Sequence, residues 1–114
     1  MYELNPTVVN LAEPGGLRYL QVGIVLEFWP LIEDYYDLEG EAKTAAEDKF
    51  KSDIDVWRPV IDDLVMTHLS SKTYNDISTI AGKQALKDEL MVAVNEILGY
   101  EGVINIYFTN FIVQ

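Results

Sequence analysis

His68 is the only histidine in the chain, so a histidine-based metal site or a Ser-His-Asp triad would have to include it. Asp62 and Asp63 are poorly placed as its partners, because they fall on other faces of the helix predicted there. Ser70 and Ser71 lack the Gly-x-Ser-x-Gly elbow that presents a nucleophilic serine. Because the chain has no cysteine either, its residue types favour a non-enzymatic protein. His68 is then expected to end a helix, where the helix dipole favours a cation.

The acidic run Asp34–Glu41 superficially resembles a calcium-binding loop. If Gly40 held the sixth position of such a loop, Tyr35 would be the first ligand and Ala46 the twelfth. Neither residue has the carboxylate that those positions require. We therefore expect a solvated acidic loop and no metal or cofactor. A looser cation- or ligand-binding site around the aspartates of this loop is the alternative function.

The net charge of the chain indicates which kinds of partner it is not expected to bind. The chain has 8 Lys and Arg residues against 19 Asp and Glu residues, which gives a net charge of −11. Nucleic acid and anionic lipid surfaces are bound through clustered basic side chains, so neither is an expected partner. No run approaches the roughly 20 consecutive apolar residues that a membrane-spanning helix needs. The 114 residues are expected to form one soluble domain.

Aromatic residues gather next to the acidic stretch 30–56. Trp29 lies next to this polar stretch, and Tyr35 and Tyr36 lie near its start, so all three can be exposed, whereas Phe28 is expected in the core. Aromatic side chains beside acids can anchor a protein partner. These three residues are therefore candidates for contact with a partner or with another copy of the chain.

Hydrophobic periodicity places these residues on a small set of elements. Residues 7–12 and 17–29 are predicted strands, and residues 103–114 are a long closing strand rich in β-prone side chains. Apolar residues recur at every second position of the longer early strand, which predicts one buried sheet face made by Leu20, Val22, Ile24, Leu26 and Phe28. The closing strand is expected to present Ile104, Ile106, Phe108 and Ile112 on one face.

Three helices are predicted between the long strands. The run 39–50 consists of good helix formers and is expected to be a solvated helix. A second helix covers about 59–69, and a third begins after Ser78 or Thr79 as N-cap and ends at Gly99 as left-handed C-cap. The buried face of the second helix is expected to hold Ile61, Leu64, Val65, His68 and Leu69.

This β-β-α-α-α-β order predicts an α/β (α+β) fold. The sheet is expected to be mixed or antiparallel, with long strands and with helices covering one face. The two longest strands are natural neighbours in it.

Several motifs occur together in the second half of the chain. A closing Tyr-Phe-Thr-x-Phe-x-x-Gln follows Ser-Ser-Lys-Thr and Gly-Lys-x-x-Leu-Lys, and this combination is specific although each piece alone is weak. In these motifs the chain resembles the family of the flagellar basal-body protein FliL. The likeness covers 17–29 and 57–114, whereas 30–56 is longer and more acidic than the family pattern. The matching runs are Arg18–Val22, Pro59–Val65, Leu69–Ile77, Gly82–Leu90, Asn95–Leu98 and Val103–Gln114.

The resemblance implies a fold similar to the stomatin/prohibitin (SPFH) domain and a non-enzymatic role. It implies association with the MotA and MotB stator units of the flagellar motor, assembly into a ring of identical subunits, and support of motility. It also implies a single-pass inner-membrane protein of the flagellar basal body, with residues 1–114 as its periplasmic domain. The N-terminal cytoplasmic tail and transmembrane helix of such a protein are absent from this chain. Self-association is expected to strengthen with salt unless opposite charges hold it.

Two further groups are candidates for contact with the stator or with another copy. Residues 2–12 would lie nearest the membrane, and their β-prone edge could extend a partner's sheet. Lys72 belongs to a polar connector between two predicted helices, for which the alternative is a turn that caps those helices. The candidates in these two groups are Val8, Val9, Leu11, Lys72, Thr73 and Tyr74.

Overall fold

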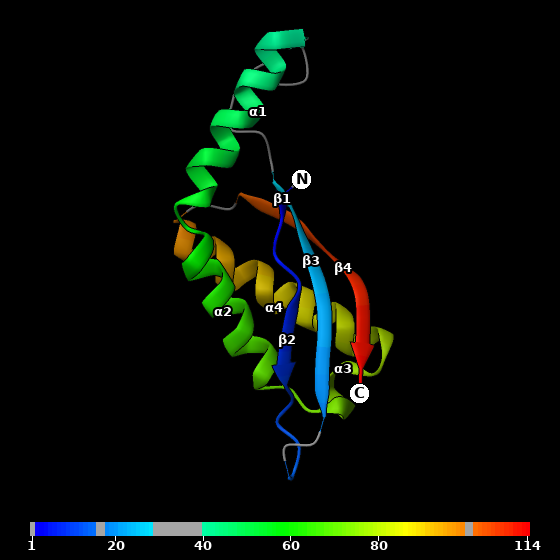
Figure 1. The fold of residues 1–114 in the computed structure, drawn as a ribbon. Helices are drawn as coiled ribbons and strands as arrows, with labels where there is room; N and C mark the ends of the chain where they lie inside the picture. Colours follow the sequence, from blue (N-terminus) through cyan, green and yellow to red (C-terminus); the bar gives the residue numbers. More distant parts are fainter. Residues whose placement is uncertain (1, 16–17, 29–39, 100–101) are drawn as a thin grey trace.

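The computed structural model describes residues 2–15, 18–28, 40–99 and 102–114. These residues form an antiparallel sheet with helices packed on one face, so the predicted α+β class is confirmed (Figure 1). The strands are β1 (Tyr2–Glu3), β2 (Thr7–Asn10), β3 (Tyr19–Phe28) and β4 (Val103–Val113). The helices are α1 (Gly40–Asp55), α2 (Arg58–Ser70), α3 (Tyr74–Ile77) and α4 (Ile80–Leu98).

β3 is the central strand of the sheet. β4 pairs with it along nearly its whole length, from Leu20 opposite Val113 to Phe28 opposite Val103. β1 and β2 pair with β3 at different points of its length, and Figure 1 shows them one after the other along the same edge. The two longest strands are therefore neighbours, as was expected for strands of this length.

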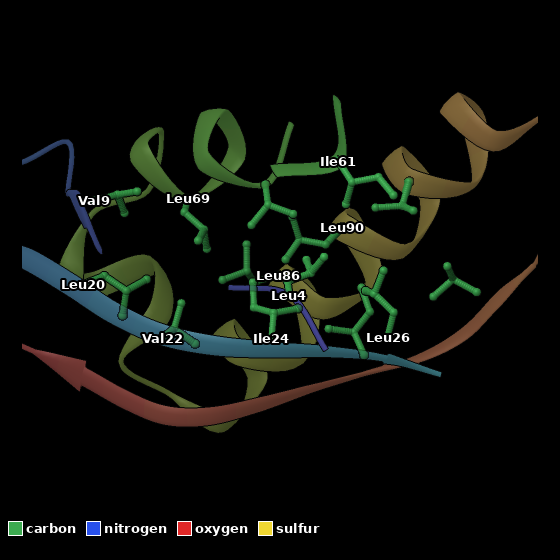
Figure 2. Close-up of a cluster of buried hydrophobic side chains, with 14 of the residues drawn as sticks. Leu4, Val9, Leu20, Val22, Ile24, Leu26, Ile61, Leu69, Leu86 and Leu90 are labelled. Carbon is green, nitrogen blue, oxygen red and sulfur yellow. The ribbon is translucent and has the colours of Figure 1, made fainter. Parts of the chain in front are cut away.

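The core lies between the sheet and the helices α2 and α4. Every second side chain of β3 points into it, and Leu20, Val22 and Leu26 are completely buried. Figure 2 shows these side chains meeting Ile61 and Leu69 from α2 and Leu86 and Leu90 from α4. The period-two pattern of this strand and the buried face of α2 are thus confirmed.

The ends of α4 follow from local sequence. Thr79 is the N-cap, with its side-chain hydroxyl accepting a hydrogen bond from the amide of Gly82 at 2.9 Å. Gly99 ends the helix in the left-handed conformation, with φ at 81°. These predicted boundaries are confirmed, and the buried residues Leu86, Leu90, Ala93 and Val94 define the face of α4 that packs in the core.

The predicted inward face of the closing strand is partly wrong. Ile106 and Phe108 are buried and half-buried as expected, but Ile104 and Ile112 are 37% and 44% exposed. The reason is that the alternation of inward and outward side chains changes within β4. At the start of the strand the odd-numbered Val103 is buried, and further along the even-numbered Ile106 is buried. A strand that keeps strict alternation cannot bury both Val103 and Ile106.

Two bulges cause this change. Between the pairs Gln21–Ile112 and Gly23–Thr109, β4 advances one residue more than β3, and Asn110 in this interval has a positive φ of 52°. A second extra residue, Ile104, occurs between the pairs Glu27–Asn105 and Phe28–Val103. Each bulge shifts the side chains beyond it to the opposite face of the sheet.

α1 extends beyond the end of the sheet in Figure 1, and it is longer than predicted, ending at Asp55. Ile54 is buried and Phe50 is half-buried, and the centre of the Phe50 ring lies 5.0 Å from that of the Phe28 ring in an edge-on contact. Most of its other side chains are exposed, which confirms the solvated helix. Near its end, the hydroxyl of Tyr2 donates a hydrogen bond to Asp55, and burial together with this bond raises the pKa of Tyr2 to about 12.

Candidate interaction surfaces

The connector between α2 and α4 is held by a three-residue cluster. One carboxylate oxygen of Glu89 lies 2.7 Å from Nζ of Lys72, and the other lies 2.7 Å from Nδ1 of His68. The cluster joins the last turn of α2 to the middle of α4. Lys72, a candidate contact residue, therefore has an internal partner that lies 17 residues away in the sequence and that periodicity alone did not identify.

Electrostatics in this cluster favour the ionised carboxylate. Burial raises the pKa of Glu89, but the hydrogen bonds and charges from Lys72 and His68 outweigh it, so that its pKa is lowered overall. His68 lies at the end of a helix as predicted, and its ring faces this carboxylate rather than a serine. These contacts hold the end of α2, and Lys72 just beyond it, against α4.

Thr73 caps α3, a short helix that the sequence analysis had treated as part of the connector. Its hydroxyl accepts a hydrogen bond from the amide of Asp76, whose carboxylate accepts one from the amide of Thr73 at 2.9 Å. Hydrogen bonding of this carboxylate to the backbone amide and the side chain of Thr73 lowers the pKa of Asp76. The capping alternative for the connector is thus confirmed for Thr73.

Of the three connector candidates, only Tyr74 is exposed, and 38% of its surface is accessible. Its backbone amide donates a hydrogen bond to the carboxylate of Glu13, and the guanidinium of Arg18 lies 4.3 Å from the centre of its ring. The amide of Ala12 also donates to the carbonyl of Lys72 at 2.8 Å. The connector is therefore packed against the turn between β2 and β3, and its Tyr74 edge stays accessible.

The three candidates in the N-terminal segment have different environments. Val9 and Leu11 are buried at 6% and 3% exposure, so their side chains stabilise the core and present no surface. Val8 is 62% exposed on the face of the sheet opposite the helices. It borders a shallow hollow of about 280 Å³ that is also lined by Tyr19, Gln21, Ile112 and Gln114. Of the three candidates in this segment, only the side chain of Val8 is therefore accessible to a partner.

The other end of this sheet face is polar. Glu27 accepts hydrogen bonds from the hydroxyl of Tyr107 at 2.7 Å and from the side-chain amide of Asn105 at 2.9 Å. These bonds lower the pKa of Glu27 and raise the pKa of Tyr107. Residues from β3 and β4 thus share one network across the strands.

Trp29, Tyr35 and Tyr36 lie outside the described residues, as do the aspartates of the acidic loop. Within residues 2–15, 18–28, 40–99 and 102–114, no three His, Asp or Glu side chains are grouped so that they could hold a metal ion. None of the helices in the same ranges is long and apolar enough to cross a bilayer.

Comparison with known sequences gives two findings. The sequence model of the family described as "Flagellar basal body-associated protein FliL" matches residues 1–114. The "Flagellar protein FliL" of Aquifex aeolicus (strain VF5) is 35% identical over 115 aligned residues, which cover 100% of this chain. The chain spans 61% of the length of that relative.

Proposed function

Because this chain belongs to the family of the flagellar basal body-associated protein FliL, we propose that it is a non-enzymatic protein that associates with the MotA and MotB stator units and supports motility. The observation that carries the proposal is the family match over all 114 residues. The match includes the acidic stretch 30–56, which had set the chain apart from the family pattern.

A non-enzymatic role agrees with how the chain uses its one histidine. His68 and Lys72 both contact the Glu89 carboxylate, so the three polar side chains tie α2 to α4. Several apolar and aromatic side chains of the described residues, Val8 and Tyr74 among them, are exposed, and such side chains suit contact with another protein.

In this proposal the domain lies in the periplasm at the flagellar basal body. It is carried by a single N-terminal helix in the inner membrane, and identical subunits form a ring around or beside the stator. The support is the resemblance to the FliL family, in which such an arrangement is expected. Val8 and the hollow beside it are the proposed stator-facing surface.

Stator support would work through a shift in populations. If the domain binds the periplasmic part of MotB more tightly in its active state than in its inactive state, bound stators become active more often. A tenfold preference corresponds to about 1.4 kcal/mol of coupling. A protein with equal affinity for both states would shift nothing.

The test counts fluorescently labelled MotB units per motor in cells that swim under viscous load. Cells would carry the intact protein, Val8→Asp or Val92→Asp. Val92 is a matched control, because its side chain is 56% exposed on α4, against 62% for Val8 on the sheet. We expect Val8→Asp to lower stator occupancy and swimming speed while Val92→Asp leaves both unchanged. Equal occupancy in cells that lack the protein altogether would refute stator support.

A further inference from the structure

Two apolar side chains stand out among the described residues because they are the most exposed ones of large size. Ile80, at the start of α4, is 90% exposed, and Val56, in the turn between α1 and α2, is 76% exposed. Apolar side chains at such exposure contribute little to the core, so neither position is explained by the fold. The two positions differ in the sign of the charges around them.

The surface around Val56 is acidic. Trp57 and Val60 are 41% and 45% exposed beside it, and together with Asp53 and Asp63 these residues form what we call the α1–α2 patch. The charged residues from 53 to 63 are four aspartates and Arg58. Arg58 reaches the N-terminal segment, where it donates a hydrogen bond to Asn5 at 2.8 Å.

The surface around Ile80 is basic. Lys83 and Lys87 follow it at helical spacing, and the three residues form what we call the α4 patch. The ammonium groups of Lys83 and Lys87 lie 4.8 and 5.4 Å from the ring centres of Phe111 and Phe108. Among the described residues, neither lysine has a carboxylate within 4.0 Å.

We propose that the α1–α2 patch of one copy docks on the α4 patch of the next copy, head to tail. The patches belong to different parts of the molecule. Figure 1 shows the α1–α2 junction at the left of the view and the start of α4, which follows α3, at the right. A contact between two different surfaces of identical subunits is heterologous and builds rings or helical filaments. The inference rests on the self-assembly part of the proposed function, and it names the surfaces that mate.

Charge explains why these two surfaces select each other. Each copy has a net charge of −11, so two copies repel over most of their surfaces. The α4 patch offers two lysines that have no carboxylate partner within residues 2–15, 18–28, 40–99 and 102–114, next to an apolar side chain. Trp57 can meet such lysines both as an apolar surface and as a cation–π partner. Because opposite charges hold the contact, we expect it to weaken with salt, contrary to the general trend for so acidic a protein.

The test uses disulfide trapping of the full-length protein in its native membrane. The 114 residues have no cysteine, so introduced thiols are the only ones this domain contributes. Val56→Cys and Ile80→Cys variants with tags of different size are expressed together and oxidised. We expect the mixed dimer, little dimer from either variant alone, and a ladder of multimers from the double variant. A matched pair, Val8→Cys with Val92→Cys, is equally suited to oxidation because both positions are over 50% exposed, and it should give no mixed dimer.

Charge reversal then separates this contact from chance collisions. Lys83→Glu with Lys87→Glu should reduce the mixed dimer about tenfold, because like charges would then face each other. Asp53→Lys with Asp63→Lys in the other copy should restore it. A dimer from Val56→Cys alone, no mixed dimer, or a yield unaffected by charge reversal would overturn the proposal. Stator occupancy is measured separately, so loss of occupancy with intact trapping would reject stator support while the head-to-tail contact stands.

Discussion

Gly23 on β3 lies directly opposite Thr109 on β4, and a Cβ at position 23 would come within 2.2 Å of the threonine hydroxyl. The pair joins the two longest strands at a point where the sheet has no space for a second side chain. The hydroxyl occupies the volume that any other residue at position 23 would need. This close approach, rather than a positive φ, is what requires the glycine.

Gly23→Ala is therefore expected to lower the free energy of unfolding by about 1–3 kcal/mol, as overpacking does in other cores. Thr109→Ala removes the nearest atom and leaves the Thr109 carbonyl oxygen at 3.3 Å, so the double variant should recover part of the loss. Urea denaturation of the four proteins in a double-mutant cycle measures the coupling. Strictly additive effects would show that the hydroxyl is not the obstacle.

Asn110 lies in the β-bulge after which the side chains of β4 change faces of the sheet. Its φ of 52° suits asparagine or glycine and is strained for a β-branched residue. We expect Asn110→Val to destabilise the domain by about 1–2 kcal/mol, whereas Asn110→Gly should change its stability by less than about 0.5 kcal/mol. The control is Gln21→Val, an exposed strand position with ordinary backbone geometry. If Asn110→Val proved as stable as the native protein, the bulge would not require this conformation.

Glu89 should make stability depend on pH in the acid range. A carboxyl whose pKa is lowered by folding stabilises the folded state above its ordinary pKa of 4.5, and this contribution disappears as pH falls through the lowered value. Glu89→Gln should therefore cost about 1 kcal/mol at pH 7, a figure reduced for partial exposure of the cluster, and progressively less below 4.5. Thermal unfolding at several pH values measures this difference.

The matched control for Glu89 is Asp88→Asn, one residue earlier on the exposed side of α4. Asp88 accepts a hydrogen bond from Gln84 at 3.0 Å, on the exposed surface. Its substitution should change stability by less than about 0.5 kcal/mol at every pH. If the difference in stability between Glu89→Gln and the native protein grew as the pH fell, folding would not lower the pKa of Glu89.

Local signals were enough to predict most of the fold. The alternation from Leu20 to Phe28 identified the central strand, and Thr79 and Gly99 marked the ends of α4. Each of these features depends on residues close together in the sequence. The short β1 had no such signal, because two residues become a strand only by pairing with Leu26 and Val25.

The candidate surfaces were harder to predict, because they depend on contacts between distant residues. Nothing local to Lys72 indicates that Glu89 binds it, whereas period-two alternation places Val9 on the same face as Leu11 and Val8 on the opposite face, a signal that was present but not used. The bulge at Asn110 needs one extra residue in β4 relative to β3, a property of the pair of strands. The Thr-x-x-Asp capping signal of α3 was present at Thr73 and Asp76, and it could have identified that helix.

The most direct measurement of the central claim is photo-crosslinking of the full-length protein in its native membrane. A photoreactive residue would replace Val8, and a second preparation would carry it at Val92, which has similar exposure on α4. We predict a covalent adduct with MotB from position 8 and none from position 92. An adduct only between copies of the protein, or with proteins outside the flagellar motor, would contradict direct association with the stator through this surface.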